Sequence, residues 1–340
     1  MTVRDAIAVV VRRGSLSAEE MASVVEEMMG GGATPAQIGG FLLALRMKGE
    51  SVEELCGAAS ALRRHATPVR RPPGSVVDTC GTGGDARGTF NISTTAALIA
   101  AGAGVTVAKH GNRAMSGTVG GADVLEVLGV SLDVGASGLE RCLAEVGMAF
   151  LFAPGLHPAM ARVAGPRREL GVRTIFNLIG PLANPAGVRH QVVGVFGREW
   201  VSPMAQALAC LGAVRALVVH GRDGLDEITL TDVTDAAEVN GGRVREFVLA
   251  PEEFGLPKCT LDALRVADAG EAAGVVRHVL SGERGPRRDI SLANAAAALY
   301  VAGRCESFAE GTALAADSVD TGRARAVLDR LVRWSRDQAA

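Results

Sequence analysis

The chain has 340 residues and a mass of 34.9 kDa, so it is long enough for two domains and a large buried core. Hydrophobic residues make up 48% of it and charged residues 21%, as in soluble globular proteins, and no apolar stretch reaches the roughly 18 residues that a membrane helix needs. The formal net charge of -2 argues against an extended nucleic-acid-binding surface and leaves room only for a local basic cleft.

Before residue 70, the sequence predicts about four short helices and no strand. The expected helices span 5–13, 21–29, 36–49 and 55–65. Capping-box patterns at 17–20 and 51–54 open the second and fourth helices, and a Thr-Pro pair at 34–35 opens the third. Residues 1–70 are therefore expected to form a small all-helical domain, and the helix-breaking segment RRPPG at 70–74 is expected to act as a hinge.

After residue 70, β-branched runs that end in glycine alternate with segments of helical periodicity. Strands are expected at 75–81, 104–111, 193–197 and 215–221, and helices at 93–103, 121–129, 138–147 and 202–213. This alternation predicts an α/β domain over residues 71–340, with a mostly parallel sheet flanked by helices. Ligands of open α/β sheets bind at the carboxyl ends of strands, so three polar loops that follow strands are expected to converge on one cleft.

The first polar loop is GTGGD at 81–85. Glycines admit positive φ and let successive backbone N–H groups approach an anion, although the loop matches neither GxxxxGK[ST] nor GxGxxG and could be only a tight turn. The run from Asn91 to Thr95 favours an anion, because it places hydroxyls and free N–H groups at a helix start. Cys80 could be a nucleophile, but no His or acidic partner is obvious, which favours a small residue that fills the turn.

The second and third loops carry charge. Residues 109–113 place three potential cations and an amide directly after a strand, which favours anion binding over a surface charge cluster. HGRDGLDE at 220–227 ends in Asp226 and Glu227, a pair that is usually solvated in a loop. Beside a phosphate pocket, the same carboxylates could bind Mg²⁺, and the metal would explain acidic residues next to an anion site.

The N-terminus and the cysteines indicate the cellular compartment in which the protein is expected. The first apolar run is flanked by residues of both charges and lacks a small-residue cleavage site, which indicates a helix and not a signal peptide. Six cysteines are scattered without a CxxC pair. This spacing favours free thiols in a reducing cytoplasm over a disulfide or metal framework.

In their order and over nearly the whole length, the motifs resemble those of the anthranilate phosphoribosyltransferase family. They are GTGGD (81–85), NIST (91–94), KHGNRAMS (109–116), GADVLEVLGV (121–130), FAPGLHPAM (152–160), GPRRELGVRTIFNLIGPLANP (165–185), HGRDGLDE (220–227) and LANAAAALY (292–300). The resemblance implies that a segment near 161–185 joins the helical domain, that the larger domain is of the nucleoside-phosphorylase type, and that a homodimer forms through the helical domains. It implies transfer of the phosphoribosyl group of phosphoribosyl pyrophosphate to anthranilate, with release of pyrophosphate, in tryptophan biosynthesis.

The resemblance also implies a set of site residues. The substrate-binding residues would be Gly81, Gly83, Gly84, Asp85, Thr89, Asn91, Ile92, Ser93, Thr94, Lys109, His110, Gly111, Asn112, Arg113, Ala114, Ser116, Gly117, Gly121 and Arg167. Of these, Asn112 and Arg167 would contact anthranilate, while Ser93, Asp226 and Glu227 would contact Mg²⁺. Lys109 and His110 are possible catalytic assistants, and no strong general base is required because the attacking amine is neutral. The family commonly has serine where this chain has Gly117 and Gly121, so backbone N–H groups are expected to replace two hydroxyls.

Two other interpretations stay open at this point. The first is a pyrimidine-nucleoside phosphorylase on the same fold, against which KHGNRA and GPRRELG argue. The second is a non-catalytic, nucleic-acid-binding relative. Such a protein would be basic and would have lost the Mg²⁺ and anthranilate motifs, whereas this chain has a formal charge of -2 and keeps the Asp-Glu pair.

Overall fold

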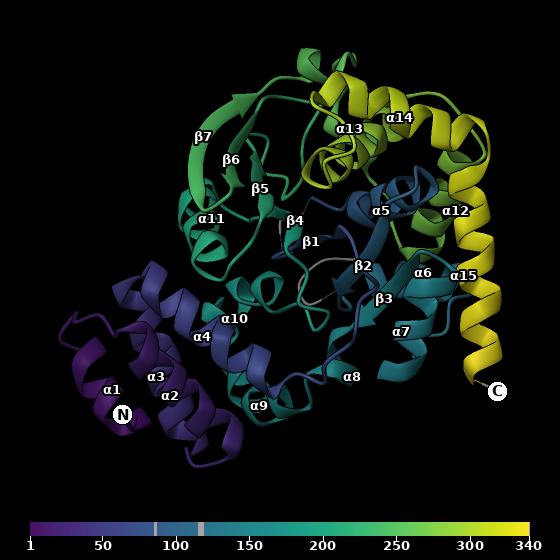
Figure 1. Ribbon diagram of the computed structural model, residues 1–340. Coiled ribbons are helices and arrows are strands. Elements are labelled where there is room, and N and C mark those ends of the chain that lie inside the picture. The colour runs from purple at the N-terminus through teal and green to yellow at the C-terminus, as the bar shows by residue number, and fades with distance from the viewer. Residues whose placement is uncertain (85–86, 115–118, 340) are drawn as a thin grey trace.

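The computed structural model describes residues 1–84, 87–114 and 119–339. The N-terminal part is a bundle of α1 (Val3–Val10), α2 (Ala18–Gly30), α3 (Pro35–Lys48) and α4 (Val52–His65), which stands to one side of the rest of the chain (Figure 1). All four expected helices are confirmed. The first begins two residues earlier than expected, because Thr2 and Asp5 form a capping box that the sequence analysis overlooked.

The remaining chain forms a 7-stranded sheet in the order β3-β2-β1-β4-β5-β6-β7. The strands are β1 (Val76–Gly81), β2 (Thr106–Gly111), β3 (Met148–Phe152), β4 (His190–Gly194), β5 (Arg215–Gly221), β6 (Thr234–Asn240) and β7 (Arg243–Leu249). Strands β1 to β5 pair in parallel, and β6 and β7 add an antiparallel edge. The expected fold class, a mostly parallel sheet flanked by helices with a smaller helical part, is confirmed.

The expected strand positions were incomplete. The strand at 193–197 was placed too late, because β4 begins with the polar residues His190 and Gln191, and buried Gln191 donates from its side chain to the Pro181 carbonyl at 2.9 Å. Phe196 has already left the sheet, since its N–H donates to the Thr82 hydroxyl. β3 and the β6–β7 hairpin were not expected at all.

The part of the chain after the bundle contains further helices. They are α5 (Ile92–Gly102), α6 (Gly121–Leu128), α7 (Ala136–Glu145), α8 (Ala153–Leu156), α9 (Ala161–Leu170), α10 (Ile175–Leu178), α11 (Val201–Cys210), α12 (Ala269–Leu280), α13 (Pro286–Val301), α14 (Phe308–Asp320) and α15 (Arg323–Ala339). α5 and α13 contact β1 on one face, and α11 contacts β5, β6 and β7 on the other. None of the helices in the described part of the chain combines the length and apolar composition that crossing a bilayer requires.

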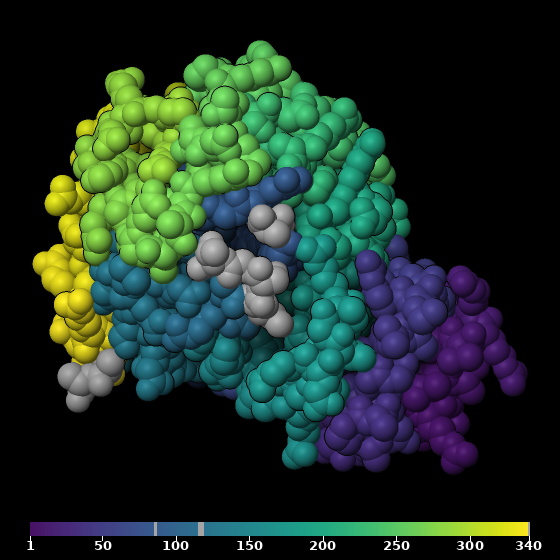
Figure 2. Space-filling model, turned by 180° about the vertical axis from the view of Figure 1, so that it is seen from behind, coloured from purple at the N-terminus to yellow at the C-terminus, as the bar shows by residue number. Residues whose placement is uncertain are grey.

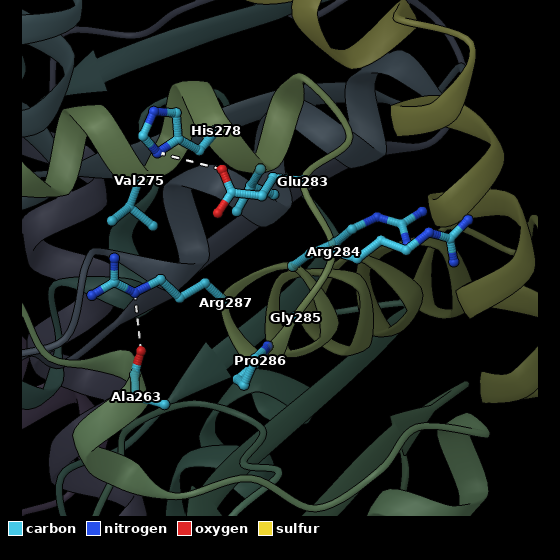
Figure 3. A pocket seen from close by; sticks show the side chains of 10 residues that line it. Ala263, Val275, His278, Glu283, Arg284, Gly285, Pro286 and Arg287 are labelled. Carbon is cyan, nitrogen blue, oxygen red and sulfur yellow. Dashed lines mark hydrogen bonds and ion pairs between the residues drawn. The ribbon is translucent and has the colours of Figure 1, made fainter.

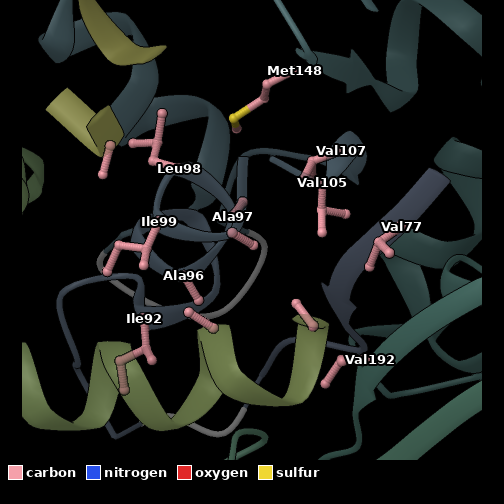
Figure 4. Packing of buried hydrophobic residues seen from close by; sticks show 14 of the residues in the cluster. Val77, Ile92, Ala96, Ala97, Leu98, Ile99, Val105, Val107, Met148 and Val192 are labelled. Atoms are coloured by element: carbon pink, nitrogen blue, oxygen red, sulfur yellow. The ribbon is translucent and has the colours of Figure 1, made fainter. Parts of the chain in front are cut away.

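Two hydrophobic cores result from this arrangement. The larger core lies around α5, whose Ala96, Ala97, Leu98 and Ile99 pack against strand valines such as Val77 and Val107 (Figure 4). The second core joins the helical bundle to the opposite sheet face through α11 and the segment 175–183. α9 contacts α2 and α3, so this later segment packs on the bundle.

Candidate active site

The glycine loop after β1 encloses a carboxylate. Gly83 donates its N–H to Asp226 Oδ2 at 2.9 Å, and a Cβ on Gly81 would lie 2.8 Å from the same oxygen. A Cβ on Gly194 would lie only 1.6 Å from the Asp226 carbonyl oxygen, so glycine is required there. The bare backbone of β1 and β4 therefore brings Asp226 against the loop that was expected to bind phosphate.

Ser93 links the start of α5 to the second half of the acidic pair. Its N–H donates to Glu227 Oε1 at 3.1 Å, and its hydroxyl accepts from Lys109 Nζ at 3.1 Å. Lys109 also donates to the Thr79 carbonyl. Burial lowers the pKa of Lys109, and the nearby Asp78 carboxylate opposes that shift. The three polar loops thus converge as expected, and Ser93, Asp226 and Glu227 gather at the carboxyl ends of the strands.

Asp78 links β1 to β2 and to Asn184 close to this site. It is fully buried, its Oδ1 accepts the His110 N–H at 3.0 Å, and its Oδ2 accepts from Asn184 Nδ2 at 2.8 Å. Asn184 also donates to the Ala108 carbonyl at 2.9 Å. Neither residue was expected at the site, although an aspartate inside the apolar run VVDTC was a signal that a buried partner exists.

His110 faces a second buried histidine, His157, with ring centroids 5.1 Å apart. The Nε2 of His110 is buried without a hydrogen-bond partner in the described residues, and both ring nitrogens of His157 are buried near the Ala183 backbone. Burial lowers the pKa of His110 to about 3 and the pKa of His157 to about 4, so both rings are neutral at pH 7. His157 was not expected at the site, although it lies in the quoted motif FAPGLHPAM.

Asn91 and Thr94 present polar atoms that the fold does not satisfy. Asn91 has a left-handed backbone with φ 63° at the N-cap of α5 and makes no side-chain cap. Its Oδ1 and the Thr94 hydroxyl are buried without a partner in the part of the chain described. A Cβ on Gly121 would lie 3.2 Å from Thr94 Oγ1 and 3.7 Å from Asn91 Oδ1, so the glycine opens a small space between α5 and α6.

Several expected binding residues have structural contacts instead of an open side chain. Arg113 donates to Glu126 at 2.8 Å and to Asp123 at 3.2 Å, so α6 neutralises its charge. A Cβ on Gly111 would lie 2.7 Å from the Phe150 ring, and the Ile92 side chain is fully buried in the larger core. The Ala114 N–H donates to Asp123 Oδ2 at 3.1 Å.

The other expected residues lie on the segments that follow β1 and β2 and on α9. Thr89 forms an isolated antiparallel bridge with Arg265, and Asn112 is exposed, with its Oδ1 accepting the Arg113 N–H. Arg167 on α9 is mostly buried and lies 5.3 Å from the Phe176 ring centroid, whereas Arg168 is exposed. Burial lowers the pKa of Arg167. Asp85, Ser116 and Gly117 lie outside the described residues.

Arg173 crosses from the segment after α9 to the glycine loop and was missed by the sequence analysis. Its Nη2 donates to the Gly84 carbonyl, and its guanidinium lies 4.2 Å from the Phe196 ring centroid. Figure 2 shows the face of the molecule that carries these loops, with the helical bundle beside the α/β part. Cys80 is buried inside β1, and burial raises its pKa well above the ordinary value, which disfavours a nucleophilic role.

Comparisons with known proteins agree along the whole chain. Residues 4–66 match a family model described as the helical bundle domain of a glycosyl transferase family, and residues 73–325 match its a/b domain. Anthranilate phosphoribosyltransferase of Anaeromyxobacter dehalogenans is 55% identical over 97% of this chain and 98% of that protein. The chain belongs to the anthranilate phosphoribosyltransferase family.

Solved structures of the family have the same fold. The Thermus thermophilus enzyme superposes with a TM-score of 0.92 at 44% identity, covering 98% of this chain and 99% of that one. The Saccharomyces cerevisiae enzyme, in complex with PRPP and Mg, gives a TM-score of 0.91 at 28% identity and covers 98% of both chains. The family resemblance stated from the motifs is confirmed.

For a member of the anthranilate phosphoribosyltransferase family, the acidic pair has the chemistry that a magnesium site needs. In the part of the chain described, no cluster of three or more His, Cys, Asp or Glu side chains could hold a metal by itself. Mg²⁺ usually takes one or two protein carboxylates and completes its shell with phosphate oxygens and water. Asp226, Glu227 and the Ser93 hydroxyl therefore fit a metal that arrives with a phosphorylated substrate.

Proposed function

We propose that this protein transfers the phosphoribosyl group of phosphoribosyl pyrophosphate to anthranilate, giving N-(5-phosphoribosyl)anthranilate and pyrophosphate. The observation that carries the proposal is the convergence of the glycine loop, the open start of α5 and the Asp226–Glu227 pair at one edge of the sheet. A donor that carries both a pyrophosphate and a 5-phosphate requires backbone N–H groups, a cation and a metal-binding pair in one place.

The donor half of the site uses backbone and cationic groups. The N–H groups of Gly83 and Ser93 now donate to the carboxylates of Asp226 and Glu227, and they can re-pair with phosphate oxygens without moving the strands. Lys109 lies beside Ser93 and supplies a buried positive charge. Asn91 and Thr94 offer buried polar atoms next to Gly121. Asp85, Thr89, Ser116 and Gly117 complete the proposed donor contacts.

Magnesium would be held by Asp226, Glu227 and Ser93. When bound, Mg²⁺ neutralises the charge that develops on departing pyrophosphate. The reaction at the anomeric carbon passes through an oxocarbenium-like state, so orientation of the leaving group and of the attacking amine dominates the rate. The protein supplies that orientation through fixed N–H groups that need no reorganisation as charge develops.

The acceptor half of the site lies toward the bundle. Arg167 matches the anthranilate carboxylate, because guanidinium and carboxylate form two parallel hydrogen bonds. Asn112, on the loop after β2, is exposed and is the second proposed contact of anthranilate. The amine attacks as a neutral group and loses its proton after the bond forms. Burial lowers the pKa of His110 to about 3, which disfavours its protonated form, so we assign His110 and its neighbour Lys109 to positioning the reacting groups.

We further propose the domain arrangement and the assembly. Residues 1–70 with the segment 161–185 form one domain and residues 71–340 form the other, in line with the contacts of α9 to α2 and α3. Val11, Leu43 and Met47 are large hydrophobic side chains exposed on the bundle, and they support a homodimer through this domain. All six cysteines are free thiols, which supports a cytoplasmic location.

The activity is tested by the fluorescence of anthranilate, which is lost when its amine is ribosylated. We expect the signal to fall only when protein, phosphoribosyl pyrophosphate and Mg²⁺ are all present, and not when any one of them is left out. Unchanged fluorescence in the complete mixture, together with phosphorolysis of pyrimidine nucleosides by the same preparation, would establish the phosphorylase alternative instead.

A further inference from the structure

Helix α13 contains the motif LANAAAALY, for which the proposed chemistry provides no role. The helix contacts α5, β1, β4 and the short 3-10 helix Leu261–Leu264, so it touches several of the elements that carry the donor site. Two of its side chains, Asn294 and Arg287, reach outward to backbone atoms of site loops. They are seven residues apart and therefore project from about the same face of the helix.

Asn294 holds the chain directly after the acidic pair. Its Oδ1 accepts the Ile228 N–H at 3.0 Å, and its Nδ2 donates to the Ile228 carbonyl at 2.9 Å. Both residues are almost completely buried. An amide that pairs with the N–H and the carbonyl of one residue fixes that peptide in position and orientation. Glu227 is the preceding residue, so the direction in which the two carboxylates leave the chain depends on this contact.

Arg287 holds the segment that pairs with residues 88–89. Its Nε donates to the Ala263 carbonyl at 3.0 Å and its Nη2 to the Arg265 carbonyl at 3.0 Å; the first of these bonds is drawn in Figure 3. Arg265 in turn bridges Thr89, and the Val266 N–H donates to the Gly88 carbonyl at 2.9 Å. The guanidinium therefore fixes the extended segment that pairs with Gly88 and Thr89, a few residues after the glycine loop.

We propose that α13 sets the distance between the acidic pair and residues 88–89. Asn294 is the positioning residue for the acidic pair, and Arg287 is the positioning residue for residues 88–89. The helix is itself anchored, because buried Arg288 pairs with Asp320 of α14 at 2.8 Å. This inference rests on the proposed donor site. The inference goes beyond that site, because it assigns a role to two residues that hold the backbone of site loops and touch no substrate.

The first test compares Arg287→Ala with Arg284→Ala. Arg284 is an exposed arginine three residues away in the same pocket wall, so its loss removes an equal charge without removing the two carbonyl contacts. We expect Arg287→Ala to raise the KM for phosphoribosyl pyrophosphate by roughly tenfold, because small misplacements of binding groups are costly, with the KM for anthranilate almost unchanged. Arg287→Lys, which can reach one carbonyl at a time, should fall between Arg287→Ala and the unmodified protein.

The second test compares Asn294→Asp with Ser291→Ala, a buried change on the same helix that removes a hydroxyl donating to the Arg287 carbonyl. Thermal unfolding with and without phosphoribosyl pyrophosphate and Mg²⁺ reports donor binding in the absence of anthranilate. We expect Ser291→Ala to keep the ligand-induced rise in the unfolding midpoint and Asn294→Asp to lose most of it. Because no acceptor is present, this result does not depend on the acceptor assignment.

Three results would overturn the proposal. One is an unchanged KM for phosphoribosyl pyrophosphate in Arg287→Ala, which would reduce the residue to a local structural contact. Another is an equal rise in both KM values, and the third is a full ligand-induced midpoint shift in Asn294→Asp. If Asn294→Asp does not fold, the Arg287 series decides the matter alone, because Arg287 is half-exposed and its loss leaves no buried gap.

Discussion

The helices of the bundle and helix α5 of the site differ in how the polar groups at their starts are hydrogen-bonded. Each bundle helix opens with a complete capping box, at Thr2, Ser17, Thr34 and Ser51. α5, at the centre of the site, opens on Asn91 with a left-handed backbone and no side-chain cap, and two polar atoms near its start are buried without a partner in the described chain. The bundle helices satisfy the N–H groups of their first turns themselves, whereas the start of α5 leaves polar atoms for a ligand.

The largest effect is expected from the acidic pair. Replacing Asp226 and Glu227 by Asn and Gln keeps their shape and removes two charges, so turnover should fall by about a hundredfold or more, the size of effect seen when a transition-state-stabilising group is lost. The dependence on Mg²⁺ should weaken as well. Steady-state rates across a magnesium titration measure both. Full turnover at ordinary Mg²⁺ concentrations would show that the pair is not a catalytic metal site.

A second substitution separates acceptor from donor recognition. Arg167→Ala removes the proposed partner of the anthranilate carboxylate and should raise the KM for anthranilate by roughly ten- to a hundredfold, since a hydrogen bond to a charged group is worth about 1.5–3 kcal/mol. Arg168→Ala is the matched control, because that neighbouring arginine is exposed. Varying each substrate separately distinguishes the cases. A defect confined to phosphoribosyl pyrophosphate would refute the assignment.

Acid should destabilise the protein through the site more than through the bundle. Burial lowers the pKa of His110 to about 3 and of His157 to about 4, so the unfolded chain takes up protons below about pH 6.5 that the folded chain does not. Stability is therefore full above that pH and falls as the pH drops toward the folded values. The loss at pH 5 should be about 2 kcal/mol for each histidine.

Urea unfolding at pH 7 and pH 5 measures this loss, and His157→Gln should remove about half of it. The control is the same measurement on His65→Gln, which changes an exposed histidine at the C-terminal end of α4. Identical pH dependence of the unmodified protein and His157→Gln would show that the buried pair is not the source.

The smallest effect is expected in the bundle. Ser17→Ala removes one capping hydrogen bond to the Glu20 N–H and should cost about 1 kcal/mol of unfolding free energy, with both KM values and the turnover number unchanged. Chemical denaturation together with steady-state kinetics checks both halves of this statement. A change in the KM for phosphoribosyl pyrophosphate would mean that the two regions are coupled more tightly than their contacts indicate.

The same contrast explains how much could be predicted from the sequence. Local signals such as caps, periodicity and glycine runs predict the four bundle helices, the glycine loop and the helices α5, α6, α7 and α11. The contacts of Asp78 with Asn184 and of Ile228 with Asn294 join residues far apart in the chain, and no local pattern encodes them. The β6–β7 hairpin was missed because buried β6 carries Asp235 and Glu238, which pair with Arg222 and Arg215, so its sequence shows neither an apolar run nor a clear alternation.

One measurement tests the central claim, that polar atoms at the start of α5 are left without protein partners because they bind the donor. It compares the thermal unfolding midpoints of the unmodified protein, Asn91→Gly and Ser17→Ala, each with and without phosphoribosyl pyrophosphate and Mg²⁺. We expect Asn91→Gly, which preserves the left-handed backbone, to keep the ligand-free midpoint and to lose much of the ligand-induced rise. Ser17→Ala should have a lower ligand-free midpoint and the full rise. Equal losses of the ligand-induced rise in both variants, or a lowered ligand-free midpoint in Asn91→Gly with the full rise, would contradict the account.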